Sequence, residues 1–79
     1  MPTTMARVEF LLSTLNATDI GTLDSVAEKM RQVEEELRAM EQEGLAGRAA
    51  EARQSLMRGD LAEFRRGRAF LQSKIGHLR

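Results

Sequence analysis

One helical pattern constrains the fold of this chain more than any other feature. Six apolar residues between positions 23 and 40 are spaced alternately three and four apart, which places them in a narrow seam along one side of a helix. These seam residues are Leu23, Val26, Met30, Val33, Leu37 and Met40. Such spacing is typical of a helix that pairs lengthwise with another helix, as in a coiled coil.

The charges beside the seam predict the kind of partner. With Leu23 at position a, four of the six flanking e and g positions hold Glu, and the set is Ala27, Lys29, Glu34, Glu36, Glu41 and Glu43. Two copies of this helix would place Glu beside Glu, so we expect a basic partner helix rather than a second copy.

The second half of the chain carries the basic residues that such a partner needs. Residues 44–79 contain eight Lys or Arg and three acids, whereas residues 1–43 contain four Lys or Arg and nine acids. In the last helix, Arg65, Lys74 and Arg79 occupy e and g positions of its own heptad. The sequence therefore predicts a coiled-coil-like antiparallel hairpin in which residues 19–43 pack against residues 47–78.

Composition indicates an all-α fold. The chain has a single proline, Pro2, and neither Trp nor Tyr, which disfavours a sheet. We expect one helical domain over residues 1–79, with helices at about 3–15, 19–43, 47–58 and 60–78 and with Thr18 or Thr22 capping the second. Gly44 is expected to end that second helix in the left-handed conformation.

The segment around Gly59 and Asp60 leaves two alternatives open. A helix stop at Gly59, followed by Asp60 as N-cap and Glu63 three residues later, predicts a break. The apolar spacing from Met57 through Leu61 to Phe64 instead continues across the site, as in one long helix. We favour the break, because Gly costs about 1 kcal/mol inside a helix and Asp is a strong N-cap.

The sequence offers little for catalysis. There is no Cys, and the single histidine, His77, has no carboxylate three or four residues before it that would complete a metal site. We therefore expect neither enzymatic activity nor a cofactor. No apolar stretch is long enough to cross a bilayer and no signal peptide is evident, so we expect a cytoplasmic protein that does not bind a membrane.

Two phenylalanines indicate a second contact surface. Phe10 and Phe70 each lie far from the apolar stripe of their helix, and Arg66 and Lys74 lie on the side of Phe70. A chain of 79 residues is near the lower size limit for a stable single core. We therefore expect a homodimer that completes a helical bundle, with these four residues as interaction candidates. Arg68, a polar residue in the apolar seam of its helix, is a candidate for fixing register.

The preferred function is a protein–protein interaction or oligomerisation module, such as an adaptor, regulator or small chaperone. The alternative is a nucleic-acid-binding helical protein that contacts phosphates through one basic group. That group contains Arg58, Arg65, Arg66, Arg68 and Lys74.

Residues 56–71 read LMRGDLAEFRRGRAFL, in which a helix ends in a basic-Gly turn and restarts with an acidic-aromatic-basic run. This segment resembles the second half of the small helical-hairpin co-chaperones that hold type III secretion needle subunits. The extra N-terminal helix and the expected turn at Gly44 depart from that pattern. The resemblance implies a helical hairpin that docks on a larger helical protein, and it assigns no binding residue.

Overall fold

The computed structural model describes residues 4–19 and 21–78. Within this part of the chain lie four α-helices and one short 3-10 helix, and no strand: α1 (Thr4–Asn16), η1 (Ala17–Asp19), α2 (Leu23–Ala39), α3 (Glu43–Met57) and α4 (Leu61–Gly76). The prediction of an all-α fold is confirmed.

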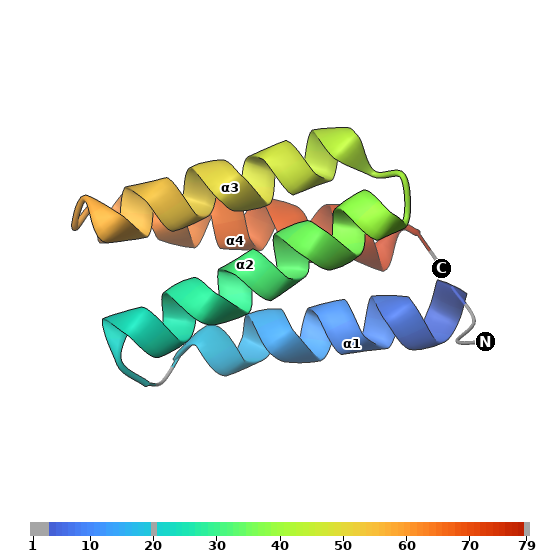
Figure 1. The fold of residues 1–79 in the computed structure, drawn as a ribbon, viewed down its shortest axis with the longest axis horizontal. Helices are drawn as coiled ribbons and strands as arrows, with labels where there is room; N and C mark the ends of the chain where they lie inside the picture. Colours follow the sequence, from blue (N-terminus) through green and yellow to red (C-terminus); the bar gives the residue numbers. More distant parts are fainter. Residues whose placement is uncertain (1–3, 20, 79) are drawn as a thin grey trace.

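The helices alternate in direction and form a closed ring of contacts. Consecutive helices run antiparallel, and α1 lies along α2 on the side away from α3 (Figure 1). The most extensive contacts join α2 to α3 and α3 to α4, while α1 packs against both α2 and α4. The predicted antiparallel packing of the second helix against residues 47–78 is therefore present for α3, whereas α4 does not pack against α2 within the described residues.

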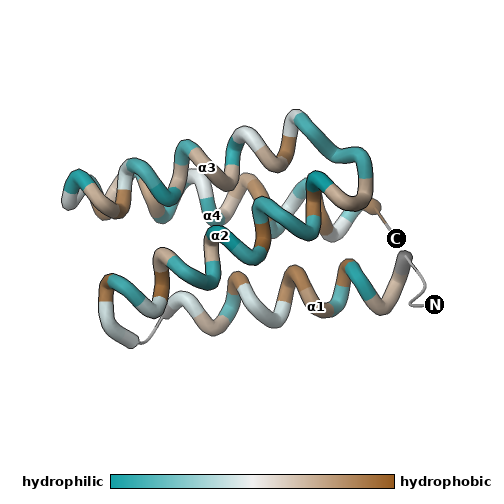
Figure 2. The backbone as a smooth tube through the Cα atoms, viewed as in Figure 1, coloured by the Kyte–Doolittle hydropathy of each residue, from teal (hydrophilic) through white to brown (hydrophobic). Residues whose placement is uncertain are grey.

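One apolar core fills the space between the helices. Hydrophobic positions recur along the helices between hydrophilic ones (Figure 2). The buried apolar residues are Val8, Leu11 and Leu15 of α1, Val26, Met30, Val33 and Leu37 of α2, Ala46, Ala49, Ala52 and Leu56 of α3, and Phe64, Leu71 and Ile75 of α4. Four of the six seam residues are thus buried as predicted. Met40 is only partly buried. Leu23 is 48% exposed, because it begins α2 at the end of the bundle.

Small residues let α3 and α4 approach closely. The buried face of α3 includes Ala49, Ala52 and Ser55. A Cβ atom placed on Gly67 of α4 would lie 3.0 Å from the Cβ of Ala52, closer than most real contacts of this kind. The absence of a side chain at Gly67 therefore permits this helix spacing.

The first turn lies earlier than the predicted turn at Gly44. Helix α2 ends at Ala39, and Glu41 takes the left-handed conformation with φ 61°. The amide of Gln42 donates to the carbonyl of Leu37 at 2.8 Å, and that of Glu41 donates to Arg38 at 3.0 Å, which is a Schellman ending.

The earlier turn has a physical reason. It lets α3 begin at Glu43, so that Ala46 lies on the buried face of a helix. It also places the Glu43 carboxylate in the first turn of α3, where the helix dipole favours a negative charge, instead of in the last turn of α2. Gly44 accordingly lies inside α3.

The second turn is the predicted break. Gly59 takes the left-handed conformation with φ 81°, and Asp60 caps α4 by accepting a hydrogen bond from the amide of Glu63 at 3.2 Å. Of the two alternatives, the continuous helix is therefore excluded. Thr22 caps α2 in the same way, since its hydroxyl oxygen accepts from the amide of Ser25 at 3.1 Å.

Candidate interaction surfaces

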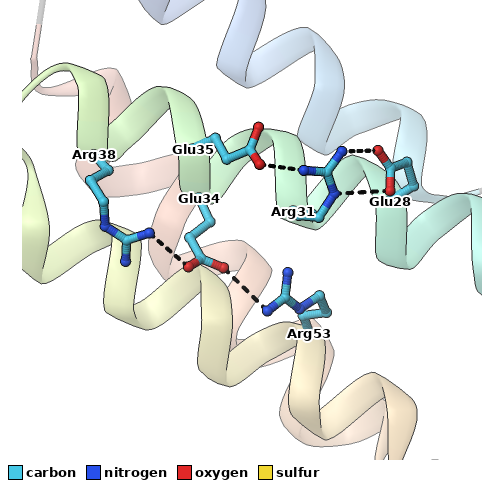
Figure 3. A network of polar contacts seen from close by, with 6 residues as sticks. All are labelled: Glu28, Arg31, Glu34, Glu35, Arg38 and Arg53. Carbon is cyan, nitrogen blue, oxygen red and sulfur yellow. Dashed lines mark hydrogen bonds and ion pairs between the residues drawn. The ribbon is translucent and has the colours of Figure 1, made fainter.

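Charged side chains join α2 to α3 along the edge of the seam. Glu34 lies between Arg38 of α2 and Arg53 of α3 (Figure 3). One carboxylate oxygen is 3.0 Å from Nη1 of Arg38, and the other is 3.4 Å from Nη2 of Arg53. The side chain of Glu34 is only 14% exposed, so its carboxylate is better shielded from solvent than the other side chains that form these ion pairs. It helps to set the register of α2 against α3.

A second charged group lies on α2 alone. Arg31 donates hydrogen bonds to Glu28 and to Glu35. The hydrogen bond from Arg31 lowers the pKa of Glu28, and the same bond with the nearby carboxylates raises the pKa of Arg31. The pKa of Arg38 is also raised, by its hydrogen bonds to Glu34 and then Glu43. The exposed pairs of Arg31 with Glu28 and Glu35 contribute little to stability, because water screens them.

The bases of other helices that contact the acids of α2 differ from those expected. They are Arg53 of α3 and Arg7 of α1, whose Nε lies 3.5 Å from Oε1 of Glu36. The last helix was expected to supply them through Arg65, Lys74 and Arg79, of which Arg79 lies outside the described residues. For Arg65 and Lys74 the prediction was wrong, because α4 packs against α3 and α1 and lies diagonally across the bundle from α2.

Phe70 lies in a groove between α3 and α4. Arg48 of α3 and Lys74 of α4 lie over its ring, with the charged groups 5.0 Å and 5.7 Å from the ring centre. The groove has a volume of about 250 Å³ and is lined by Arg48, Glu51, Ala52, Ser55, Glu63, Arg66, Gly67 and Phe70. Three of the four predicted interaction candidates, Arg66, Phe70 and Lys74, thus come together here. Sequence analysis missed Arg48, which comes from another helix.

Phe10 lies on a different surface. It is 49% exposed and adjoins a hollow of about 280 Å³ with Ala6 and Arg7 of α1 and Glu36 of α2. Since the Phe70 groove is formed by α3 and α4, one molecule does not bring the two phenylalanines together. Within one molecule the two rings therefore lie on two surfaces, and a dimer surface that contains both stays a prediction.

Arg68 lies where α4 meets η1. Its side chain is partly buried, and Nη1 donates to the hydroxyl oxygen of Thr18 at 3.4 Å. Thr18 in turn donates to the carbonyl oxygen of Leu15 at 2.6 Å. Arg68 therefore links the last helix to the segment that follows α1, which is a polar contact of the kind that fixes register.

A third surface, which sequence analysis missed, is a pocket at the end of the bundle where α2 and α4 begin. This end pocket has a volume of about 320 Å³. Buried Val26, Leu56 and Phe64 form its apolar floor. Leu23 and Leu61 line it while remaining 48% and 49% exposed. Thr18, Gly21, Arg65 and Arg68 complete the lining.

The end pocket has a sequence signal that could have located it. Leu23 and Leu61 each follow a helix N-cap directly, Thr22 and Asp60 respectively. In a bundle of alternating helices, α2 and α4 begin at the same end, so the two leucines meet there.

The basic residues of the nucleic-acid alternative are divided between two surfaces. Arg65 and Arg68 line the end pocket, whereas Arg66 lines the Phe70 groove and pairs with Glu63 at 3.4 Å. Lys74 lies over Phe70, and Arg58 donates to Ser55 at 3.3 Å. These five residues form no continuous basic patch.

The described residues offer neither a metal site nor a membrane span. No group of three or more His, Cys, Asp or Glu side chains there could hold a metal ion. None of the helices, as far as the structure describes them, has both the length and the apolar character that a membrane span requires.

Comparison of the chain with family models, with curated proteins and with solved structures finds no match.

Proposed function

We propose that this chain is a protein–protein interaction module that receives an apolar side chain of a helical partner in the end pocket. The observation that carries the proposal is the pairing of two half-exposed leucines, Leu23 and Leu61, with a buried apolar floor. A concave site with an apolar floor and a polar rim is where binding energy concentrates when a partner's anchor residue enters.

The magnitudes support a binding role for this pocket. Full burial of a leucine contributes about 1.5–3 kcal/mol, so covering the exposed half of each leucine contributes about 1 kcal/mol per side chain. The Phe70 groove offers less, because Arg48 and Lys74 already lie over the ring. The end pocket is therefore the stronger of the two anchor sites.

The sequence resemblance and the composition support a kind of partner and a cellular compartment. The resemblance of residues 56–71 to needle-subunit co-chaperones implies docking on a helical protein, which fits a module of adaptor, regulator or chaperone type. The cysteine-free composition suits the reducing cytoplasm.

Affinity capture from the native cell extract tests the proposal when three versions of the chain are compared. Wild type and Phe70→Ser are expected to retain the same proteins, and Leu61→Ser is expected to lose them. Phe70→Ser is the matched control, because it removes an exposed apolar side chain from a different surface. Equal capture by Leu61→Ser, with an unchanged circular dichroism melting curve, would exclude the end pocket as the binding site.

Salt dependence tests the nucleic-acid alternative. Because its five basic residues are split between surfaces, we expect no change in the fluorescence anisotropy of labelled DNA or RNA even at low salt. Binding that falls steeply as salt is added would instead favour contacts with phosphates.

A further inference from the structure

We infer that the end pocket is filled by Phe10 of a second copy of the chain, with Glu9 of that copy beside Arg65. This inference rests on the proposed function, because it names the partner of the same pocket. As in the predicted homodimer, Phe10 takes part in self-association. Its binding site on the other copy is the end pocket, and Phe70 takes no part in the contact.

Phe10 is suited to be the inserted side chain. Of the three phenylalanines it is the most exposed, at 49%, compared with 37% for Phe70 and 5% for Phe64. It lies outside the buried stripe of α1 that contains Val8 and Leu11. Its neighbour Glu9 is also exposed, so the solvent-facing part of α1 carries both an aromatic ring and a carboxylate, about 100° apart around the helix. Aromatic residues, Phe among them, are enriched at the core of protein interfaces relative to the rest of the surface.

The end pocket is suited to receive this side chain. Its volume of about 320 Å³ is roughly twice that of a 150 Å³ apolar cavity known to hold benzene. A phenyl ring therefore fits with room for the approach of its helix. The floor offers aliphatic contacts from Val26 and Leu56 and an aromatic contact from Phe64, and aromatic pairs gain stability beyond the area they bury.

Arg65 supplies the charge complementarity. It is exposed and lines the pocket. The other described arginines all have a hydrogen bond, an ion pair or a ring contact, and Arg65 alone among them has none. Glu9 likewise has no ion pair among the described residues. A contact between Glu9 and Arg65 of two copies would therefore pair two opposite charges without breaking an existing bond.

The contact joins two different surfaces of the chain, the outer face of α1 and the end pocket. One copy can therefore use its Phe10 while another offers its pocket. A copy that lacks the Phe10 ring still has an intact end pocket, and a copy with a defective end pocket still has its Phe10 ring. Such a pair can therefore form one complete contact. This property makes the inference testable by complementation.

Sedimentation equilibrium at micromolar concentrations tests the apolar part. The wild type is expected to self-associate, and Phe10→Ser and Leu61→Ser are each expected to weaken association by about tenfold or more. Phe70→Ser is the matched control and should associate like the wild type. Equimolar Phe10→Ser and Leu61→Ser should form a mixed complex that is tighter than either variant alone.

Charge exchange tests the polar part independently. Glu9→Arg and Arg65→Glu are each expected to weaken association, and the two together in one chain are expected to restore it. Both positions are exposed, so folding should be preserved, and circular dichroism melting checks this.

Three results would overturn the inference: a wild type that stays monomeric, a Phe10→Ser variant that associates as tightly as the wild type, or a charge exchange without recovery. None of these would decide the proposed function. That depends separately on whether Leu61→Ser loses the proteins captured from the extract.

Discussion

The two turns on either side of α3 share one backbone geometry but use different residues. In both, the residue after the helix cap is left-handed, and it is Glu41 in the first turn and Gly59 in the second. Both turns make the same pair of backbone hydrogen bonds. The longer-range bond of the pair runs from the amide of Gln42 to the carbonyl of Leu37 at 2.8 Å in the first turn, and from the amide of Asp60 to the carbonyl of Ser55 at 2.9 Å in the second. The difference lies in the side chains.

This comparison shows that the backbone turn does not require the residue that best suits it. A non-Gly residue in the left-handed region costs about 1–2 kcal/mol, and the first turn bears this cost at Glu41. The N-cap of α3, Gln42, makes no capping hydrogen bond, whereas Asp60 caps α4. The conformation of the first turn is therefore stabilised mainly by the packing of α2 against α3. The conformation of the second turn is stabilised by Gly59 and Asp60 as well.

The largest effect is expected when the second turn is given the residue of the first. Gly59→Glu should lower the free energy of unfolding by about 1–2 kcal/mol, because Gly59 has φ 81° and a side chain is strained there. Space is not the cause, since nothing lies within 4 Å of a Cβ at this position. Urea denaturation measures the change, and unaltered stability would show that the turn does not hold this conformation in solution.

Removal of the cap of the second turn should have the next largest effect. Asp60→Ala is expected to destabilise the fold by about 1 kcal/mol, because the amide of Glu63 loses its acceptor. Asp60→Asn retains an acceptor and is the matched control. If both variants lose the same stability in thermal denaturation, the hydrogen bond is not the cause.

The converse change at the first turn should stabilise the protein. Glu41→Gly removes the left-handed strain but increases the entropy of the unfolded chain, so we expect a net gain of about 0.5–1 kcal/mol. Gly44→Ala is the matched control. Because Gly44 lies inside α3, alanine should stabilise there too, whereas it would destabilise if Gly44 were the left-handed residue of this turn.

Addition of a cap to the first turn should have a smaller effect. Gln42→Asp provides an acceptor at the N-cap of α3, where Gln makes no side-chain hydrogen bond, and we expect a gain of about 0.5 kcal/mol. Gln42→Asn separates the hydrogen bond from the interaction of a negative charge with the helix dipole. A loss of stability in both variants would contradict the assigned helix start.

The smallest effect is expected at the ion pair that crosses the first turn. Nε of Arg38 lies 3.3 Å from Oε2 of Glu43, and both side chains are at least half exposed. Glu43→Gln should change the melting temperature slightly at low salt and less at high salt, because ions screen exposed pairs. A salt-independent change would indicate a loss of packing instead.

The features that the sequence predicts well are those that depend on residues close together in the chain. The seam of α2 is a periodic pattern within one helix, so its burial and its pairing with α3 were predictable from Val26, Met30, Val33 and Leu37. Gly59 and Asp60 are adjacent and agree with each other, which made the second turn predictable. The prediction that Gly44 ends the second helix was wrong, because the left-handed residue of the first turn is Glu41, a residue type with no preference for that conformation.

The interaction surfaces were harder to predict, because their residues come from separate elements. The exposure of Phe10 and Phe70 followed from their positions on their helices, but the order of the helices around the bundle put them on different surfaces. The end pocket combines Leu23, Leu56 and Arg65 from three helices. The sequence shows that Leu23 and Leu61 each follow an N-cap, but the relative placement of the helices is what brings Leu56 and Arg65 to the same pocket.

The packing of α1 against α4 has a consequence for how this protein folds. The other helix pairs in contact are consecutive in the chain, so short loops form them quickly, whereas α1 meets α4 only after most of the chain has come together. We therefore expect α2, α3 and α4 to form the folding nucleus and α1 to dock last. In native-state hydrogen exchange, amides of α1 should then lose protection through a local opening that leaves the slowest amides of α2 and α3 undisturbed.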